Sequence, residues 1–202
     1  MNKCYLIGAG DFCGMQVPDS SDFVIAADGG YNHLEKHGIR CDLVIGDLDS
    51  LVGALPEVEI IRHPIKKDMT DMFLSYIEGA KRGYTDFAIN GACGGREDHT
   101  FANYSLLLYI KERGHTAMLF SPSSVSRVIK DESITLKGKS GKTLSVFALG
   151  GAAVGVDIIG AQYEARGVTL TPSFPLGVSN SFLDGEVTVS VREGALLIIS
   201  EL

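Results

Sequence analysis

The stretch Leu43-Val44-Ile45-Gly46-Asp47-Leu48-Asp49-Ser50 passes from an apolar run directly into two carboxylates. We interpret residues 43–45 as a buried strand, with Asp47 and Asp49 just past its carboxyl end. Two carboxylates at positions i and i+2 favour a Mg²⁺ site, because hard cations prefer oxygen ligands and bound phosphates can supply the rest. This stretch therefore predicts one strand of the fold and a candidate metal site beside it.

Three further acidic clusters follow apolar runs in the same manner. They come after residues 23–27, 58–61 and 87–90, and they read Asp28-Gly29-Gly30, Lys67-Asp68-Met69-Thr70-Asp71 and Gly94-Gly95-Arg96-Glu97-Asp98-His99. In an open α/β sheet, ligands bind at the carboxyl ends of the strands, so we expect these acids to converge. A single Asp after a strand can equally be a helix cap or a turn residue, and Asp68 or Asp71 can have that role.

The pattern of elements predicts the fold class. Up to about residue 120, β-rich apolar runs alternate with helical patterns, as in parallel α/β sheets. The expected helices run from Tyr31 to His37, from Asp68 or Thr70 to about Arg82, and from Asp98 to Arg113, each stopped by a glycine. After Ser121 only short strands are expected, at residues 143–149, 152–159, 186–192 and 195–200. We therefore predict an α/β N-terminal domain with a mostly parallel sheet, residues 1–124, followed by a small all-β sandwich domain, residues 125–202.

Composition limits the class of partner and the location. The chain has 202 residues, 45% of them hydrophobic, which suffices for one large or two small domains. A net charge of −7 without a Lys/Arg-rich run argues against nucleic acid. The four cysteines show no CxxC spacing, which favours reduced thiols and a cytoplasmic protein. No apolar stretch approaches 18 residues, so we expect no membrane span.

Two glycine-containing segments concern phosphate binding. Gly94-Gly95-Arg96 lies between an expected strand and helix, so its backbone N–H groups can face an anion while Arg96 grips phosphate oxygens. The paired glycines can also form a plain turn, and His99 can cap, pack or bind nucleotide. We interpret Gly8-Ala9-Gly10-Asp11 as a turn that lines a nucleotide pocket. The Walker A pattern is absent, which argues against a P-loop NTPase.

The order of these clusters, continued by Gly91, Asn103 and the late segment Gly177-Val178-Ser179-Asn180, resembles the thiamin pyrophosphokinase family. The resemblance implies transfer of an intact diphosphate from ATP to the thiamin hydroxyl, which gives thiamin diphosphate and AMP. It also implies a homodimer with the thiamin pocket between its subunits. In this family the α/β domain carries nucleotide and metal, and the β-sandwich contributes to the thiamin site and the dimer.

The resemblance also implies roles for individual residues, matched by position. The implied catalytic residues are Asp71, Asp98 and Arg96, and the implied Mg²⁺ ligands are Asp47, Asp49, Asp71 and Asp98. The implied ATP-binding residues are Asp28, Lys67, Gly94, Gly95, Arg96 and His99, and the implied thiamin-binding residues are Ser179 and Asn180. The chain departs from the family pattern at Tyr163-Glu164-Ala165, where Tyr-Pro-Leu is frequent, and at Ser181, where an acidic residue is frequent.

Two alternatives fit the same residues. One is another Mg²⁺-dependent phosphotransferase or a nucleotide hydrolase with a different acceptor. The other is a non-catalytic nucleotide- or thiamin-binding protein, in which the acids serve only as caps and counter-charges. An assay for AMP with and without thiamin separates the three, since a binding protein makes no AMP and a hydrolase needs no acceptor.

Overall fold

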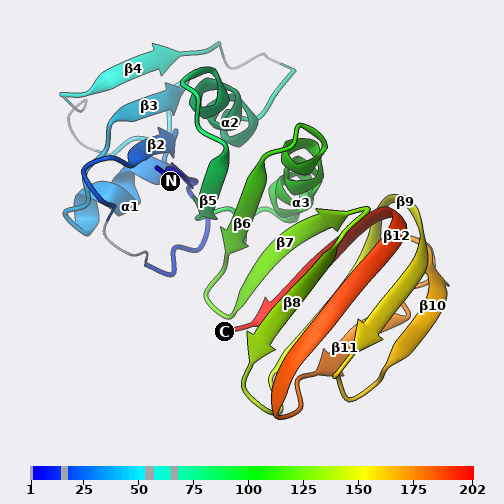
Figure 1. The fold of residues 1–202 in the computed structure, drawn as a ribbon. Coiled ribbons are helices and arrows are strands. Elements are labelled where there is room, and N and C mark those ends of the chain that lie inside the picture. Colours follow the sequence, from blue (N-terminus) through cyan, green and yellow to red (C-terminus); the bar gives the residue numbers. More distant parts are fainter. Residues whose placement is uncertain (1, 15–17, 53–56, 65–67) are drawn as a thin grey trace. The chain divides into compact units, whose positions relative to one another are not determined.

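The computed structural model describes residues 2–14, 18–52, 57–64 and 68–202 (Figure 1). The contacts within the chain divide it into two compact units. The first comprises Met1–Leu106 with Gly114–Pro122, and the second comprises Leu107–Arg113 with Ser123–Leu202.

The first unit is built on a parallel sheet. Its strands are β1 (Cys4–Ile7), β2 (Phe23–Ala27), β3 (Leu43–Gly46), β4 (Glu59–Arg62), β5 (Asp86–Asn90) and β6 (Thr116–Phe120). They lie in the order β6-β5-β1-β2-β3-β4, and each neighbouring pair is parallel, which confirms the predicted α/β class. The chain builds outward from β1 on one side and returns to its other side with β5. The topological switch therefore falls between β1 and β5, where open sheets of this kind bind ligands.

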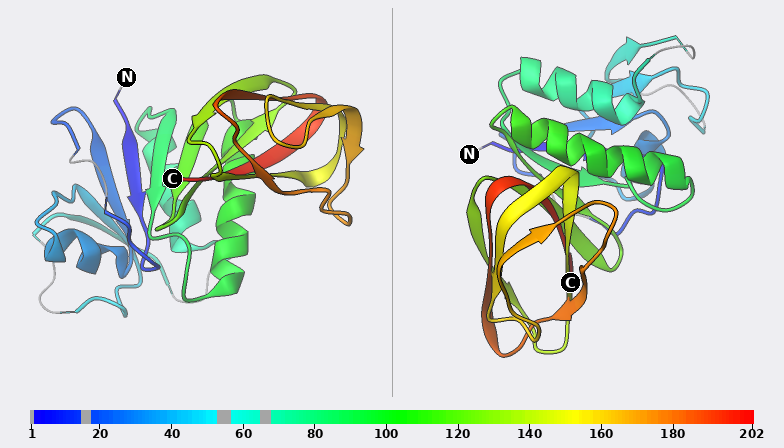
Figure 2. Two further views of the ribbon diagram at one scale, coloured as in Figure 1. Left: turned by 90° about the horizontal axis from the view of Figure 1, so that it is seen from below. Right: turned by 90° about the vertical axis from the view of Figure 1, so that its right-hand side faces the viewer.

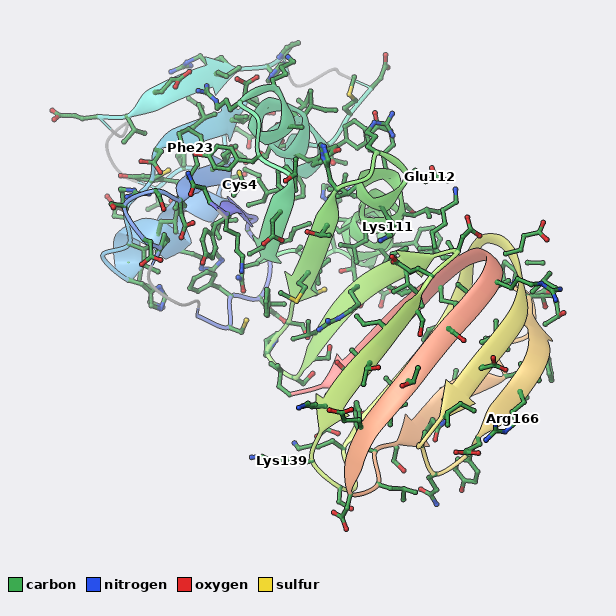
Figure 3. The ribbon with its side chains drawn as sticks, in the orientation of Figure 1. Cys4, Phe23, Lys111, Glu112, Lys139 and Arg166 are labelled. Atoms are coloured by element: carbon green, nitrogen blue, oxygen red, sulfur yellow. The ribbon has the colours of Figure 1, made fainter. Side chains whose placement is uncertain are left out.

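The helices of this unit cover both faces of the sheet. They are α1 (Gly30–Lys36), α2 (Asp71–Lys81) and α3 (Glu97–Glu112). Leu34 of α1 packs with Tyr5 and Ile7 of β1, whereas Gly79 of α2 lies against Cys4 of the same strand. Successive strand residues point to opposite faces, so α1 and α2 lie on opposite faces of the sheet. Figure 3 labels Cys4, and Phe23 beside it on β2.

The sequence offered Asp68 and Thr70 as the residue that caps α2, and the structure identifies Thr70 as the cap. The Thr70 hydroxyl accepts a hydrogen bond from the Phe73 N–H at 3.2 Å, as an N-cap side chain does. Asp71 is therefore the first helical residue, where the helix dipole favours an acid. The helix ends as expected, because Gly83 takes the left-handed conformation, with φ of 91°.

The second unit contains strands only, apart from the end of α3. They are β7 (Ser124–Lys130), β8 (Ser133–Gly138), β9 (Thr143–Ile159), β10 (Ala165–Leu170), β11 (Gly177–Ser181) and β12 (Gly185–Glu201). The sequence predicted four short strands where β9 and β12 each form one strand of 17 residues. The gaps between the expected strands contain Gly150 and Gly194, and both glycines have positive φ, but β12 continues through a register shift between Glu193 and Ala195. The glycines therefore bend the strands without ending them.

These two long strands build a sandwich, as the sequence predicted (Figure 2). The first half of β12 and the second half of β9 pair with β8 and β10, while their other halves pair with β7 and β11. Both halves contribute to one core, which includes Leu144 and Val146 of one half and Val187 and Val189 of the other. At the edge of this unit, Lys111 and Glu112, both labelled in Figure 3, form ion pairs with Glu132 and Lys130.

Two further expectations concern the whole chain. Every cysteine belongs to the described residues, and each is a free thiol: Cys4 and Cys93 are buried, Cys41 is partly buried and Cys13 is exposed. Burial raises the pKa of the Cys41 thiol to about 11. Among the residues that the structure describes, no helix is long and apolar enough to cross a membrane.

Candidate active site

A cavity of about 540 Å³ opens in the first unit at the carboxyl ends of its strands. Its lining includes many of the predicted nucleotide- and metal-binding residues: Asp28, Asp47, Asp49, Asp71, Gly94, Gly95, Arg96 and His99. Asp98 is not among the lining residues, and Lys67 lies outside the described part of the chain. Carboxylates from three of the four acidic clusters, at Asp28, at Asp47 and Asp49, and at Asp71, therefore line the same cavity. They do so because neighbouring parallel strands end at the same edge of the sheet.

Three carboxylates form the candidate cation site. Oxygen atoms of Asp28, Asp47 and Asp49 all lie within 4.8 Å of one another. Asp28 follows β2 and the other two follow β3, and the pairing of Ala27 with Ile45 places the ends of these strands side by side. The family resemblance assigned Asp28 to the nucleotide and not to the Mg²⁺ ligands, although the acidic clusters were expected to converge. The strand register brings it there, and no local pattern indicates that register.

The loop after β3 is shaped around Asp28. The Leu48 N–H donates to Asp28 Oδ1 at 3.1 Å, and the Asp49 N–H donates to Asp47 Oδ1 at 3.2 Å. A Cβ atom at Gly46 would lie 2.8 Å from the Asp28 Cβ, so a side chain at position 46 would displace that carboxylate. The glycine in the Gly46-Asp47-Leu48-Asp49 stretch therefore leaves room for the third acid.

Two consecutive glycines shape the segment between β5 and α3. Gly94 and Gly95 both have left-handed φ values, 79° and 68°, which glycine adopts without strain. They lie directly before α3, so their backbone lines the cavity near a helix N-terminus, where the dipole favours negative charge. From inside α3, the buried Asn103 side chain donates to the Ala92 carbonyl at 2.8 Å and holds the start of this segment.

Arg96 and Asp98 bind each other. The Arg96 Nη2 lies 2.6 Å from Asp98 Oδ2, and its Nε donates to Asp98 Oδ1 at 3.2 Å. This contact raises the pKa of Arg96 and lowers the pKa of Asp98. Both side chains are largely exposed, 70% and 65%, so water screens the pair and a phosphate can compete for the guanidinium. Asp98 is therefore paired with Arg96 and does not belong to the group formed by Asp28, Asp47 and Asp49.

The ends of β1 and β5 are joined along one wall of the cavity. The Gly8 N–H donates to the Asn90 carbonyl, the Gly10 N–H to Gly91, and the Asp11 N–H to Cys93, all at 2.7–2.8 Å. A Cβ atom at Gly10 would lie 2.2 Å from the Cys93 carbonyl oxygen, so only glycine allows this approach. Gly8, Ala9 and Gly10 line the cavity, as the sequence predicted for this turn.

Ser179 and Asn180, which the sequence assigned to thiamin, lie on β11 in the second unit. Ser179 is exposed and has a positive φ of 57°. Asn180 is buried, and its amide is used inside the protein: Oδ1 accepts from the Tyr163 and Ser181 N–H groups, and Nδ2 donates to the Tyr163 carbonyl at 2.7 Å. Asn180 therefore holds the backbone of Tyr163, a residue that is 64% exposed.

Comparison with known proteins covers both units. Residues 15–119 match the family model described as thiamin pyrophosphokinase, catalytic domain. Residues 131–196 match the model described as thiamin pyrophosphokinase, vitamin B1 binding domain. No curated protein sequence matches the chain significantly.

Solved structures share the fold over nearly the whole chain. The thiamine pyrophosphokinase of Bacillus subtilis has a TM-score of 0.89 and 20% sequence identity, and the match covers 99% of each chain. The enzyme of that name from Geobacillus thermodenitrificans has a TM-score of 0.84 and 22% identity, over 99% of this chain and 97% of that one. The yeast enzyme has a TM-score of 0.77 and 15% identity, over 100% of this chain and 86% of that one.

Proposed function

Because this chain belongs to the thiamin pyrophosphokinase family, we propose that it transfers a diphosphate group from ATP to the hydroxyl of thiamin, giving thiamin diphosphate and AMP. The family supports pyrophosphate transfer to thiamin, while the donor ATP and the product AMP are parts of the proposal. The observation that carries it is one cavity lined by three clustered carboxylates, a double-glycine turn and an arginine. Acids for a cation and donors for phosphates are what this reaction needs.

We propose Mg²⁺ as the cofactor, held by Asp28, Asp47 and Asp49. Three carboxylates within 4.8 Å suit a hard divalent cation, because each supplies oxygen ligands. When bound, Mg²⁺ neutralises negative charge on the transferred phosphates. Asp71 and Asp98 remain candidate ligands by position, although only Asp71 lines the cavity.

The phosphates of ATP are proposed to lie against the Gly94-Gly95 turn. The backbone N–H groups there and the N-terminus of α3 favour an anion, and Arg96 can exchange Asp98 for phosphate oxygens. His99 lines the same cavity, and Lys67 remains a phosphate contact proposed by position only.

The transfer step needs an acceptor for one proton. The thiamin hydroxyl oxygen forms a bond to the β-phosphorus while the bond from that phosphorus to the bridging oxygen of the α-phosphate breaks, and AMP leaves with that oxygen. We propose Asp71 or Asp98 as the group that takes the hydroxyl proton. Asp71 is favoured, because it lines the cavity at the start of α2 whereas Asp98 is held by Arg96.

For the second unit we propose a role in thiamin binding and in a homodimer. Large apolar side chains are exposed there, among them Tyr163, Phe174 and Leu176, each more than half exposed. Such exposure is typical of surfaces that bind a partner or a ligand. We assign residues 1–124 to nucleotide and metal and residues 125–202 to thiamin and the dimer, with Ser179 as a contact and Asn180 acting through Tyr163. Sedimentation should give about twice the chain mass of 21.6 kDa.

The free thiols of the chain support the further proposal that the enzyme works in the cytoplasm, where cysteines stay reduced. The alternatives of another phosphotransferase, a hydrolase or a binding protein are separated by product analysis. Chromatography of a reaction with ATP, Mg²⁺ and thiamin should yield AMP and thiamin diphosphate in equal amounts. ADP with thiamin monophosphate would overturn diphosphate transfer, AMP without thiamin would indicate a hydrolase, and no turnover would indicate a binding protein.

A further inference from the structure

We propose that His33 is a positioning residue for nucleotide binding: it holds the Gly8–Gly10 wall of the cavity through the carbonyl of Gly10. The proposal rests on the function proposed above, because it takes ATP as the ligand of that cavity. His33 itself does not belong to the residues that line the cavity, so its action is on the backbone that does.

The peptide groups around Gly10 are bonded on two sides. On the side of β5, the Gly10 N–H donates to the Gly91 carbonyl at 2.8 Å. On the side of α1, the Gly10 carbonyl lies 2.9 Å from His33 Nε2. A carbonyl oxygen can only accept, so Nε2 carries the hydrogen, in the neutral as well as the protonated ring. This part of the wall is therefore fixed between β5 and α1.

The start of α1 explains how a helix residue reaches this carbonyl. A Cβ atom at Gly30 would lie 1.9 Å from the Ile7 carbonyl oxygen, so the helix begins in direct contact with the end of β1. His33 lies three residues later, close to the same face of the helix as Gly30. The Asp28-Gly29-Gly30 cluster thus has two roles: its acid joins the carboxylate group, and its glycines bring His33 to the wall.

A second contact holds the segment just beyond Gly10. The Phe12 ring stacks on the His33 ring, with 5.1 Å between centroids and 12° between planes. It also touches His37, at 5.2 Å and 45°. Asp11, between Gly10 and Phe12, donates its N–H to the Cys93 carbonyl. His33 therefore contacts the segment twice, once through its nitrogen and once through its ring face.

Loss of His33 should affect the binding of the nucleotide and not the transfer step. Gly8, Ala9 and Gly10 offer backbone atoms and no large side chain to the cavity, so their contribution to binding depends on where the backbone is held. Without His33 the segment keeps its hydrogen bonds to the end of β5 and the Phe12 contact with His37, but it loses the hydrogen bond and the ring contact that His33 provides. Binding of ATP must then order the segment, which weakens affinity without removing any group that takes part in the transfer.

The test compares His33→Ala, His33→Gln and the control His37→Ala. The loss of one hydrogen bond and one ring contact should raise the KM for ATP about fivefold to twentyfold in His33→Ala, with kcat and the KM for thiamin changed less than about twofold. In His33→Gln the amide nitrogen can reach the Gly10 carbonyl, so most of the affinity should return. His37→Ala removes the second ring that contacts Phe12 and a bond to the His33 carbonyl, but it leaves the contact between His33 and the Gly10 carbonyl in place. It should therefore raise the KM for ATP less than about threefold, clearly less than His33→Ala.

Hydrogen exchange separates this proposal from the proposed function. The amides of residues 8–12 should exchange faster in His33→Ala than in wild type or His33→Gln, whether or not the protein makes AMP. An unchanged KM for ATP together with unchanged exchange overturns the role of His33, as does a failure of Gln to improve on Ala. If His33→Ala does not fold, Phe12→Leu removes the ring contacts with His33 and His37, leaves the bond to the Gly10 carbonyl in place, and should raise the KM for ATP about twofold to threefold; no rise would equally overturn the proposal.

Discussion

Replacing Asp49 with asparagine should stabilise the protein in the absence of divalent cations and destabilise it, relative to wild type, in their presence. Oxygen atoms of Asp28, Asp47 and Asp49 lie within 4.8 Å of one another, so each pair of charges repels by at least about 0.9 kcal/mol even in water. The substitution would remove two of the three repulsive pairs, about 1.7 kcal/mol in all. The new amide would keep an oxygen to accept the Ser50 hydroxyl hydrogen, which now bonds Asp49 Oδ1 at 2.9 Å.

The assay is thermal unfolding, first in EDTA and then with increasing MgCl₂. In EDTA the melting temperature of Asp49→Asn should exceed that of wild type by roughly 3 to 7 °C. Wild type should gain about 2.7 kcal/mol when Mg²⁺ reaches a hundred times its dissociation constant, and the variant should gain much less, so the two curves cross. Activity should fall with the loss of the Mg²⁺ response.

Asp184→Asn is the matched control, because it makes the same change of net charge at an exposed position in the second unit. It should leave both the melting temperature in EDTA and the response to Mg²⁺ unchanged. If Asp49→Asn behaves like this control, or if Mg²⁺ stabilises it as much as wild type, the three carboxylates do not form a cation site.

Three further predictions address other parts of the molecule. Arg96→Lys should slow AMP formation roughly tenfold to hundredfold, since a point charge cannot replace a bidentate guanidinium; a rate near that of wild type would exclude Arg96 from phosphate binding. Asn180→Ala should lower the free energy of unfolding in urea by about 2–4 kcal/mol, because it leaves the Tyr163 N–H and carbonyl unpaired, whereas Ser179→Ala should cost less than about 0.5 kcal/mol. Burial raises the pKa of Cys41 from its usual 9.0 to about 11, so the folded state holds this proton more tightly and its stability should fall as pH rises between these values. Cys41→Ala should flatten that decline. If the urea midpoints of wild type and Cys41→Ala fall by the same amount between pH 8 and pH 10.5, the prediction is wrong.

Much of the fold could be predicted because its signals are local. The Thr70 cap and Gly83 mark the ends of α2, and the alternation of Val187, Val189 and Val191 on the buried face marks a sandwich strand. The continuity of β9 and β12 could not be predicted in this way. Gly150 and Gly194 have positive φ values, as glycines in turns do, so the residue type alone does not separate a bend within a strand from a turn between strands. Only the pairing with distant strands distinguishes the two.

The candidate site could also be predicted only where its signals are local or follow from the sheet as a whole. The convergence of the acids follows from one general property of parallel sheets, that neighbouring strands end at the same edge. The grouping of Asp28 with the Asp47 pair depends on the register of β2 with β3, which is not a local property. Asn180 bonds Tyr163, which is 17 residues away in the chain. His33 was not predicted, because no chemical motif marks a histidine that contacts a backbone carbonyl.

The close contact of the β1 and β5 ends limits how this protein can change over evolutionary time. Cβ atoms at Gly8, Gly10 and Gly91 would lie 2.4, 2.2 and 2.1 Å from backbone carbonyl oxygens, which cannot rotate away as a side chain can. Random substitution at these positions should therefore be purged whatever ligand is under selection. A change of specificity, natural or engineered, has to come from side chains elsewhere around the cavity, and a library that randomises this wall would consist largely of misfolded variants.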